Sequence, residues 1–259
     1  MEIQNHMRYN LRLNLSDQTI RNRLAEAGLR NFRPATFPML HDAHKQARLD
    51  WANAHSGWGL NEWRTVLFTD ESRFTVRFSD GRIGVWRLSR ERFQARFVRQ
   101  VDRYGGGSVM VWAGVCYQGK TPLHIVHDSM TALKYRDDVL RPIAIPYGQE
   151  ALGANFRYLD DNARPHRARI VREFMEQQPV QWMPFPAKSP DCNAIEHIWD
   201  VLGRKVASRN PRPQNVEELS AALLEEWEAI TLGEIRNLIQ SMPRRLNEVI
   251  ASAGGPTRY

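Results

Sequence analysis

The stretch RTVLFTDESRFTVRF, residues 64–78, sets the fold class of this chain. It is rich in β-branched and aromatic residues, a composition that favours a strand. Two more strand candidates follow, GSVMVWAGVCYQG at 107–119 and TPLHIVH at 121–127, joined by a turn at Gln118-Gly119. Strands that follow one another with short turns predict a meander, the antiparallel part of a sheet.

Downstream of this meander the pattern alternates between helix and strand. We expect a helix at about Thr131 to Ala144, a strand at 155–161, a helix at 167–178, a strand at 180–185, a helix at 195–208, and two late helices, at about Val216 to Ile230 and about Leu232 to Ala251. Helices interleaved with strands predict an α/β domain in which helices flank a mixed sheet.

Composition narrows the class of protein further. The chain has 259 residues, 42% of them hydrophobic, and a formal net charge of +7. Such a chain is long and apolar enough to bury a core, which argues against disorder. No apolar run approaches the roughly 18 residues that span a bilayer. Two cysteines cannot form a disulfide framework, which is typical of a reducing compartment. The basic excess makes a polyanionic partner plausible.

Three acids stand at the ends of predicted elements. Asp70 follows the apolar run 66–68, Asp161 follows the strand FRYL, and Glu196 lies at a helix start behind the loop KSPDCN. Buried acids that meet repel one another unless a cation lies among them, and hard divalent ions such as Mg²⁺ prefer oxygen ligands. Two such ions suit phosphoryl displacement. The alternative is that each acid only caps a turn or a helix.

Four blocks of sequence carry a resemblance to a known family. They are LFTDESRF (67–74), YGGGSVMVWAG (104–114), LDDNARPH (159–166) and FPAKSPDCNAIEHIWDVL (185–202). In this order they resemble the mariner superfamily of DNA transposases, Tc branch. The resemblance implies a ribonuclease-H-like catalytic domain in which Asp70, Asp161 and Glu196 are the catalytic, metal-binding acids. The 34 residues between Asp161 and Glu196 match the spacing of the Tc branch.

The resemblance also implies an activity and its partners. We expect cut-and-paste transposition: strand cleavage at the inverted-repeat ends of an element, followed by transfer of the 3′-hydroxyl into double-stranded target DNA at TA. It implies Mg²⁺ or Mn²⁺, two ions, a homodimer in the synaptic complex, no membrane, and a nuclear location in a eukaryotic host or a cytoplasmic one otherwise. Two alternatives remain open, a catalytically idle DNA-binding protein derived from a transposase and a structure-specific nuclease of the same fold.

The N-terminal part contains one compact helical pattern, Leu15 to Leu29, with Ser16 as cap and Gly28 at its exit. It resembles the recognition helix of the family's second helix-turn-helix unit, which implies base contacts from Gln18, Arg21 and Asn22 and phosphate contacts from Arg23 and Arg30. An ordinary solvated helix face is the alternative.

The predicted division of the chain has three parts. We expect residues 1–30 to be a partial helix-turn-helix remnant, residues 31–60 a linker and a helix, and residues 61–259 the catalytic domain. Because the family carries two tandem helix-turn-helix units before its catalytic domain, the resemblance implies an N-terminally shortened chain.

A basic segment lies inside the predicted catalytic domain. Residues 87–103 hold six arginines against two acids, and we expect Arg90, Arg92, Arg96 and Arg99 to contact DNA phosphates. A solvated basic face is the alternative.

Several residues close to the three acids in the sequence are expected to have roles other than metal binding. Successive residues of a strand point to opposite faces, so we expect Glu71 to face away from Asp70, and Asp160 to be exposed rather than a ligand. Asp191 and Asn193 are expected to shape the loop or cap the helix before Glu196. His166 and His197 stay open, as contacts to DNA phosphate or as residues that orient a ligand.

Overall fold

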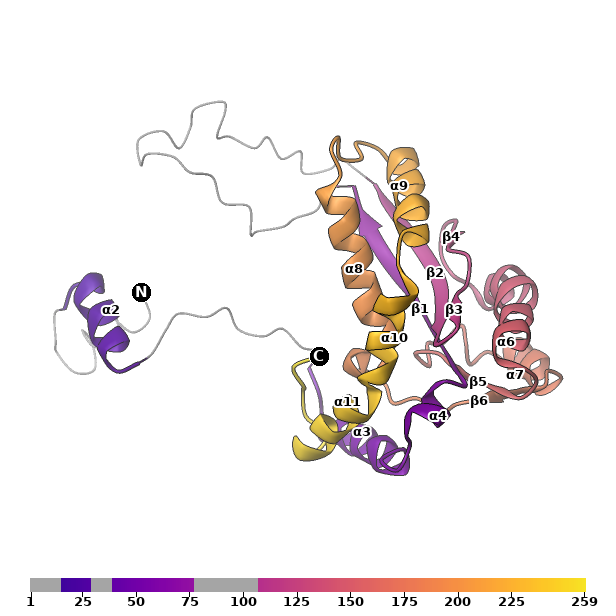
Figure 1. Cartoon of the computed structure of the whole chain (residues 1–259), viewed down its shortest axis with the longest axis horizontal. Coiled ribbons are helices and arrows are strands. Elements are labelled where there is room, and N and C mark those ends of the chain that lie inside the picture. Colours follow the sequence, from indigo (N-terminus) through magenta and orange to yellow (C-terminus); the bar gives the residue numbers. More distant parts are fainter. Residues whose placement is uncertain (1–14, 29–38, 77–106) are drawn as a thin grey trace. The chain divides into compact units, whose positions relative to one another are not determined.

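The computed structural model describes residues 15–28, 39–76 and 107–259. Backbone contacts divide the chain into two compact units, residues 1–39 and residues 40–259 (Figure 1). In the smaller unit, helix α2 (Asp17–Glu26) confirms the predicted N-terminal helix. Ser16 caps it by accepting a hydrogen bond from the backbone N–H of Thr19 at 3.1 Å, and Gly28 follows it with φ of +75°. Glycine adopts that left-handed conformation without the strain of a Cβ atom.

The larger unit is built on a mixed sheet, as predicted. Strand β1 pairs antiparallel with β2 on one side and parallel with β5 on the other. Across the described residues the order is β3-β2-β1-β5-β6, with β4 also on β2. The strands are β1 (Val66–Thr75), β2 (Ser108–Cys116), β3 (Gly119–Lys120), β4 (His124–Val126), β5 (Phe156–Leu159) and β6 (Val180–Trp182). The parallel β1–β5 pair brings the chain just after β5 beside the middle of β1.

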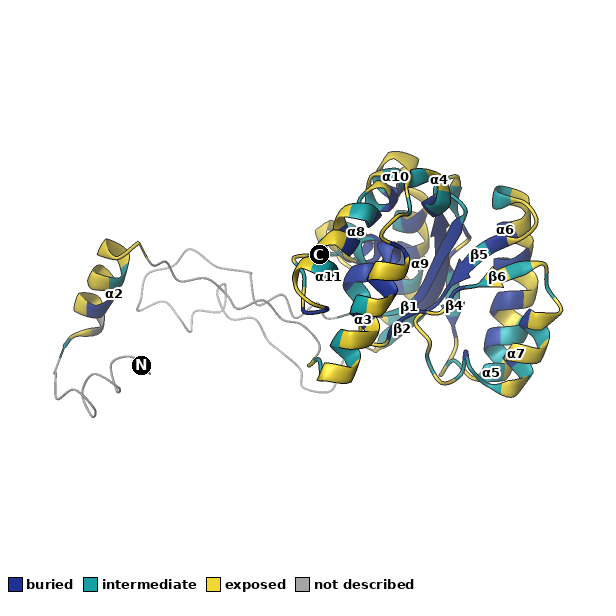
Figure 2. Cartoon of the chain, turned by 90° about the horizontal axis from the view of Figure 1, so that it is seen from below, coloured by how far each residue is buried: buried dark blue, intermediate teal, exposed yellow. Residues whose placement is uncertain are grey.

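Two hydrophobic cores cover the two faces of this sheet (Figure 2). Alternate residues of β1 serve each core: Val66 and Phe68 belong to one, and Leu67 to the other. The first core is closed by the C-terminal helices α8 (Ala194–Ser208), α9 (Val216–Glu228), α10 (Leu232–Gln240) and α11 (Met242–Ala251). The second is closed by α5 (Ala132–Lys134), the π-helix η3 (Tyr135–Ala144), α6 (Ile145–Leu152) and α7 (Arg169–Glu176).

Two helix boundaries differ from the sequence prediction. The helix expected to end at Ala144 continues through η3 and α6 to Leu152. Pro142 lies inside η3. The late helix predicted over Leu232 to Ala251 is two helices, α10 and α11, that meet at Ser241. Pro243 stands in the first turn of α11, where its missing N–H costs no intrahelical hydrogen bond.

Helix α3 (Asp42–Ala54), followed by the short helix α4 (Leu60–Trp63), packs against α11 within the larger unit. Its Arg48 is fully buried and forms an ion pair with Asp191, with Nη2 and Oδ2 2.6 Å apart. Asp191 lies in the 3-10 turn Pro190–Cys192 that precedes α8. The helix predicted beside the linker is therefore joined directly to the loop that leads to Glu196. None of the described helices is long and apolar enough to cross a bilayer.

Candidate active site

Asp70 lies in the middle of β1, on the face that packs against α8. Its neighbours on that face, Phe68 and Phe74, belong to the first core, and Asp70 itself is only 8% exposed. The indole Nε1 of Trp199, on α8, donates a hydrogen bond to Asp70 Oδ2 at 3.0 Å. Burial raises the pKa of Asp70 well above its usual value, and the nearby carboxylates of Glu196, Glu71 and Asp161 raise it further.

Asp161 lies just beyond the end of β5, where the chain turns sharply. Asn162 has a φ of +67°, and the backbone N–H of Ala163 donates to Asp161 Oδ1 at 2.8 Å, as in an Asx turn. His166 Nδ1 lies 3.0 Å from the same oxygen. Burial alone raises the pKa of Asp161, but the contact with His166 and the amide of Ala163 outweigh it and leave the pKa below its usual value.

Glu196 lies in the first turn of α8, and the cap of that helix sets its place. Asn193 Oδ1 accepts a hydrogen bond from the backbone N–H of Ile195 at 3.4 Å. The Nδ2 of Asn193 donates to the carbonyl of Thr69 at 3.1 Å, which joins the start of α8 to β1 beside Asp70. Burial raises the pKa of Glu196, and the charges of Asp161 and Asp200 add to that rise.

The three acids line one pocket of about 210 Å³, together with Phe185, Pro186, Lys188, Ser189, Pro190 and Asn193. The structure therefore brings together the residues that the sequence placed far apart. A larger, more open hollow of about 420 Å³ lies between residues 209–213 and α9. Its acids Glu218 and Glu225 are held by Asn215 and Arg209, and it contains none of the three predicted catalytic acids.

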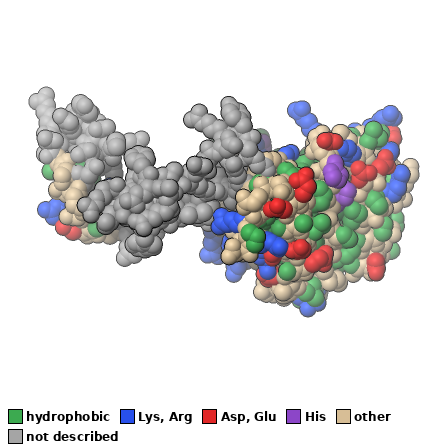
Figure 3. Space-filling model, turned by 90° about the horizontal axis from the view of Figure 1, so that it is seen from above, with side chains coloured by type: hydrophobic (Ala, Val, Ile, Leu, Met, Phe, Trp, Pro, Cys, Tyr) green, Lys and Arg blue, Asp and Glu red, His purple; other side chains and the backbone are tan. Residues whose placement is uncertain are grey.

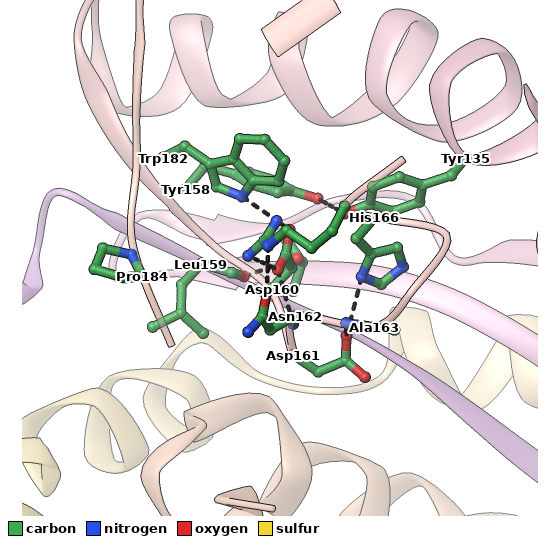
Figure 4. Close-up of polar contacts among 12 residues, drawn as sticks. Tyr135, Tyr158, Leu159, Asp160, Asp161, Asn162, Ala163, His166, Trp182 and Pro184 are labelled. Carbon is green, nitrogen blue, oxygen red and sulfur yellow. Dashed lines mark hydrogen bonds and ion pairs between the residues drawn. The ribbon is translucent and has the colours of Figure 1, made fainter. Parts of the chain in front are cut away.

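His166 occupies the other face of β1 from Asp70. Its ring is 2% exposed and stacks on Tyr135 with ring centroids 3.9 Å apart (Figure 4). Nε2 lies 3.1 Å from Glu71 Oε1, so the ring lies between two carboxylates. Burial lowers the pKa of His166, but the contacts with Asp161 and Glu71 outweigh it and raise the pKa to about 10. The sequence alone did not decide the role of His166. Its position three residues before a helix does not indicate that it contacts Asp161 or Glu71.

The expectation that Asp160 is exposed is wrong. Its side chain is 1% exposed, pairs with Arg167 at 2.7 Å, and accepts a hydrogen bond from Trp182 Nε1 at 2.9 Å. An arginine seven residues later supplies the opposite charge that burial of this carboxylate needs. Asp160 does not line the pocket, and its carboxylate and that of Asp161 point in different directions (Figure 4).

The remaining neighbours of the site have structural partners. Asp191 is buried against Arg48, and Asn193 caps α8, as expected. Glu71 contacts His166 and does not line the pocket that contains Asp70, as the alternation of the strand predicted. His197 Nδ1 lies 3.3 Å from Nη2 of Arg245, a residue of α11.

The predicted DNA-contacting residues are only partly described. Gln18, Arg21, Asn22 and Arg23 are exposed on α2, where Gln18 donates to Asn22 at 2.9 Å and Arg23 pairs with Glu26 at 2.6 Å. The other predicted contacts, Arg30, Arg90, Arg92, Arg96 and Arg99, lie outside the described residues. On the face of the larger unit seen in Figure 3, Lys and Arg side chains are interspersed with Asp and Glu.

Comparison with known families gives two matches. Residues 65–220 match a family described as DDE superfamily endonuclease, and residues 1–57 match one described as Transposase. Among curated relatives, the Tcb2 transposase of Caenorhabditis briggsae is 35% identical over 244 residues, 93% of this chain and 88% of the relative. The Tc1 transposase of Caenorhabditis elegans is 33% identical, over 94% of this chain and 88% of the relative.

Solved structures give the same fold. The Mos1 mariner paired-end complex with Mn superposes with a TM-score of 0.74 and 20% identity, over 95% of this chain and 73% of that one. The catalytic domain of Mos1 mariner transposase gives a TM-score of 0.63 at 15% identity, over 86% of this chain and all of that one. The mixed sheet with its flanking helices is therefore the ribonuclease-H-like fold that the sequence blocks implied.

Proposed function

This chain belongs to the Tc1/mariner family of DNA transposases, and from that premise we propose that Asp70, Asp161 and Glu196 are its catalytic acids and hold its divalent metal ions. One observation carries the proposal: carboxylates from β1, from the end of β5 and from the start of α8 line a single pocket. A pocket walled by three acids has the donor set of a metal-assisted phosphoryl transferase.

The residues of the pocket fit a hard divalent ion such as Mg²⁺ or Mn²⁺. The charged groups of its described lining are three carboxylates and one lysine, with no sulfur or imidazole among them. The pKa values of Asp70 and Glu196 are raised by burial and by neighbouring acids, a repulsion that a bound cation relieves. When bound, two such ions would activate the attacking oxygen and stabilise the charge that develops on the phosphate.

The side chains around the pocket hold the acids in place and attract the DNA backbone, and neither cysteine competes as a nucleophile. The Asn193 cap joins the start of α8, and with it Glu196, to β1, and the Trp199 hydrogen bond holds Asp70 against α8. Lys188 lines the same pocket and brings a positive charge to which a phosphodiester is attracted. Both cysteines are buried, so neither is placed to attack DNA as a protein nucleophile.

The substrates follow from the family. We propose that the same acids serve two successive reactions, strand cleavage at the inverted-repeat ends of the element and attack of the freed 3′-hydroxyl on target DNA at TA. In this proposal Gln18, Arg21 and Asn22 contact base edges, and Arg23, Arg30, Arg90, Arg92, Arg96 and Arg99 contact phosphates. Two copies of the chain pair the two ends, and in a eukaryotic host the reaction takes place in the nucleus.

The test is a strand-transfer assay with matched variants. A duplex carrying the element's end with a free 3′-hydroxyl is incubated with Mn²⁺ and a supercoiled target plasmid. We expect Asp161→Asn and Glu196→Gln to lower joining at least about a hundredfold, the scale of losing one electrostatic contact to a transition state. Glu173→Gln is the control, because Glu173 is half exposed and, among the described residues, pairs only with Arg169 on α7.

The products also separate the alternatives. A transposase yields joined molecules, whereas a structure-specific nuclease cuts unrelated DNA and joins nothing. Joining at the wild-type rate by Asp161→Asn would overturn the assignment of the acids. A wild-type protein that binds the ends but neither cuts nor joins them would leave the idle DNA-binding protein as the function.

A further inference from the structure

The two oxygens of Asp161 have different surroundings. Oδ1 accepts from the backbone N–H of Ala163 at 2.8 Å and lies 3.0 Å from His166 Nδ1. Within the described part of the chain, no hydrogen bond reaches Oδ2. The Asp161 side chain is 44% exposed, so packing alone does not hold its orientation. The contacts to Oδ1 therefore decide which way Oδ2 points.

His166 is buried and contacts the side chains of Tyr135, Glu71 and Asp161. It is 2% exposed, its ring stacks on Tyr135 at an interplanar angle of 22°, and Nε2 lies 3.1 Å from Glu71 Oε1. Tyr135 is fully buried and its hydroxyl lies 2.7 Å from that of Tyr158 (Figure 4). Rotating the imidazole would mean moving part of the second core, so the ring is a fixed support.

We propose that His166 is a positioning residue, which holds Oδ1 of Asp161 so that Oδ2 alone is presented to the metal ions in the pocket. This inference rests on the proposed function, because it assumes that Asp161 is a metal ligand. A side chain that orients a ligating carboxylate from behind fixes both its geometry and its affinity for the ion, and losing it typically lowers metal affinity 10- to 100-fold.

Asp70 shows the same arrangement. One of its oxygens, Oδ2, accepts from the indole Nε1 of Trp199 at 3.0 Å. Asp70 and Asp161 thus each have one oxygen in contact with a ring nitrogen, through a hydrogen bond from Trp199 in Asp70 and through a 3.0 Å ion-pair contact with His166 in Asp161. The pattern leaves one oxygen on each aspartate for the pocket, and His166 does for Asp161 what Trp199 does for Asp70.

A rival arrangement would make the imidazole itself a metal ligand. Ligand atoms of Glu71, Asp161 and His166 lie within 4.8 Å of one another, close enough to hold an ion. However, neither Glu71 nor His166 lines the pocket of the three acids. Nδ1 lies 3.0 Å from Asp161 Oδ1 and Nε2 lies 3.1 Å from Glu71 Oε1, so both ring nitrogens face carboxylates and not the pocket of the three acids. The observations therefore favour the positioning role.

Two variants test the contacts of the two ring nitrogens separately. His166→Asn keeps a nitrogen at the place of Nδ1, beside Asp161, and gives up the contact with Glu71. His166→Gln keeps a nitrogen near the place of Nε2, beside Glu71, and gives up the contact with Asp161. A merely structural role for the histidine predicts similar losses in both, whereas the positioning role predicts that only the glutamine variant suffers.

The measurement is Mn²⁺ binding to the DNA-free protein, followed by the EPR signal of free Mn²⁺. We expect His166→Asn to bind within about threefold of wild type and His166→Gln to bind about 10- to 100-fold more weakly. Equal affinities for the two variants would overturn the proposal. Asp161→Asn in the same assay tests the underlying assignment: if it binds Mn²⁺ as wild type does, the proposed function fails, whatever the histidine variants show.

A crystal structure of the wild-type protein with Mn²⁺ decides the matter if either variant does not fold. We expect His166 Nδ1 to remain within hydrogen-bonding distance of Oδ1 while Oδ2 contacts Mn²⁺. An ion bound by the imidazole, or by both oxygens of Asp161, would overturn the proposal.

Discussion

Arg48→Met is the sharpest stability test, because it breaks a buried ion pair that joins α3 to the loop before Glu196. The guanidinium and the Asp191 carboxylate are both fully buried and pair through two bonds, Nη1 to Oδ1 at 2.7 Å and Nη2 to Oδ2 at 2.6 Å. Arg48 also donates to the carbonyls of Gly254 and Gly255. Methionine fills similar space and removes all of these bonds.

The expected loss follows from the carboxylate left behind. Asp191 would keep the hydroxyl of Thr257, 2.8 Å away, and lose its counter-charge. Removing one partner of a buried pair costs about 3–5 kcal/mol. For a unit of this size each kcal/mol lowers the melting temperature by roughly 2–4 °C, so we expect a fall of roughly 6–20 °C.

The assay is thermal unfolding of the metal-free protein by circular dichroism, with Arg169→Met as the matched control. Arg169 makes the same kind of pair with Glu173, but the two side chains are 81% and 53% exposed, and an exposed helical pair is worth only about 0.3–0.5 kcal/mol. The double variant Arg48→Met, Asp191→Leu should recover much of the loss, since an apolar pair needs no counter-charge. If Arg48→Met melts within 2 °C of Arg169→Met, the reasoning about burial is refuted.

Three further predictions concern the pocket. Asn193→Ala should destabilise the fold by about 1–2 kcal/mol, measured by urea unfolding, because α8 loses its cap and its bond to β1. Trp199→Phe removes the hydrogen bond that lowers the pKa of Asp70, so the acidic limb of the pH–rate profile should move to higher pH. Because the pKa of Asp70 is raised in the folded protein, its ionisation destabilises the fold as pH rises through that pKa. Asp70→Asn should therefore raise the melting temperature of the metal-free protein at pH 8 and leave it unchanged at low pH.

Each of these three predictions has an outcome that contradicts it. An Asn193→Ala protein as stable as wild type would mean that the cap does not hold α8. An unchanged acidic limb in Trp199→Phe would show that the indole N–H does not act on Asp70. Asp70→Asn that melts below wild type at pH 8 would show that the carboxylate is stabilised in the metal-free fold.

The parts of the fold set by local pattern were predictable. The β-branched and aromatic composition of 64–78 predicted β1, and the alternation of side chains along a strand predicted that Asp70 and Glu71 lie on opposite faces. The Ser16 cap predicted the start of α2. The four sequence blocks located Asp70, Asp161 and Glu196, which share a pocket although the sequence separates them widely.

Contacts between distant residues were not predictable in the same way. Arg48 and Asp191 are 143 residues apart, and Glu71 and His166 are 95 apart, so no local spacing indicates either pair. Asp160 was expected to be exposed because it points to the opposite face from Asp161, and only the folded chain shows that Arg167 and Trp182 provide partners for it on that face. The break at Ser241 was missed because a proline in the first turn of a helix resembles one inside a continuous pattern.

Anomalous diffraction from crystals grown with Mn²⁺ tests the central claim most directly. The account predicts a manganese peak in contact with carboxylate oxygens of Asp70, Asp161 and Glu196, and its disappearance in crystals of Glu196→Gln. Manganese bound elsewhere, with these three carboxylates free of it in the wild-type protein, would contradict the account.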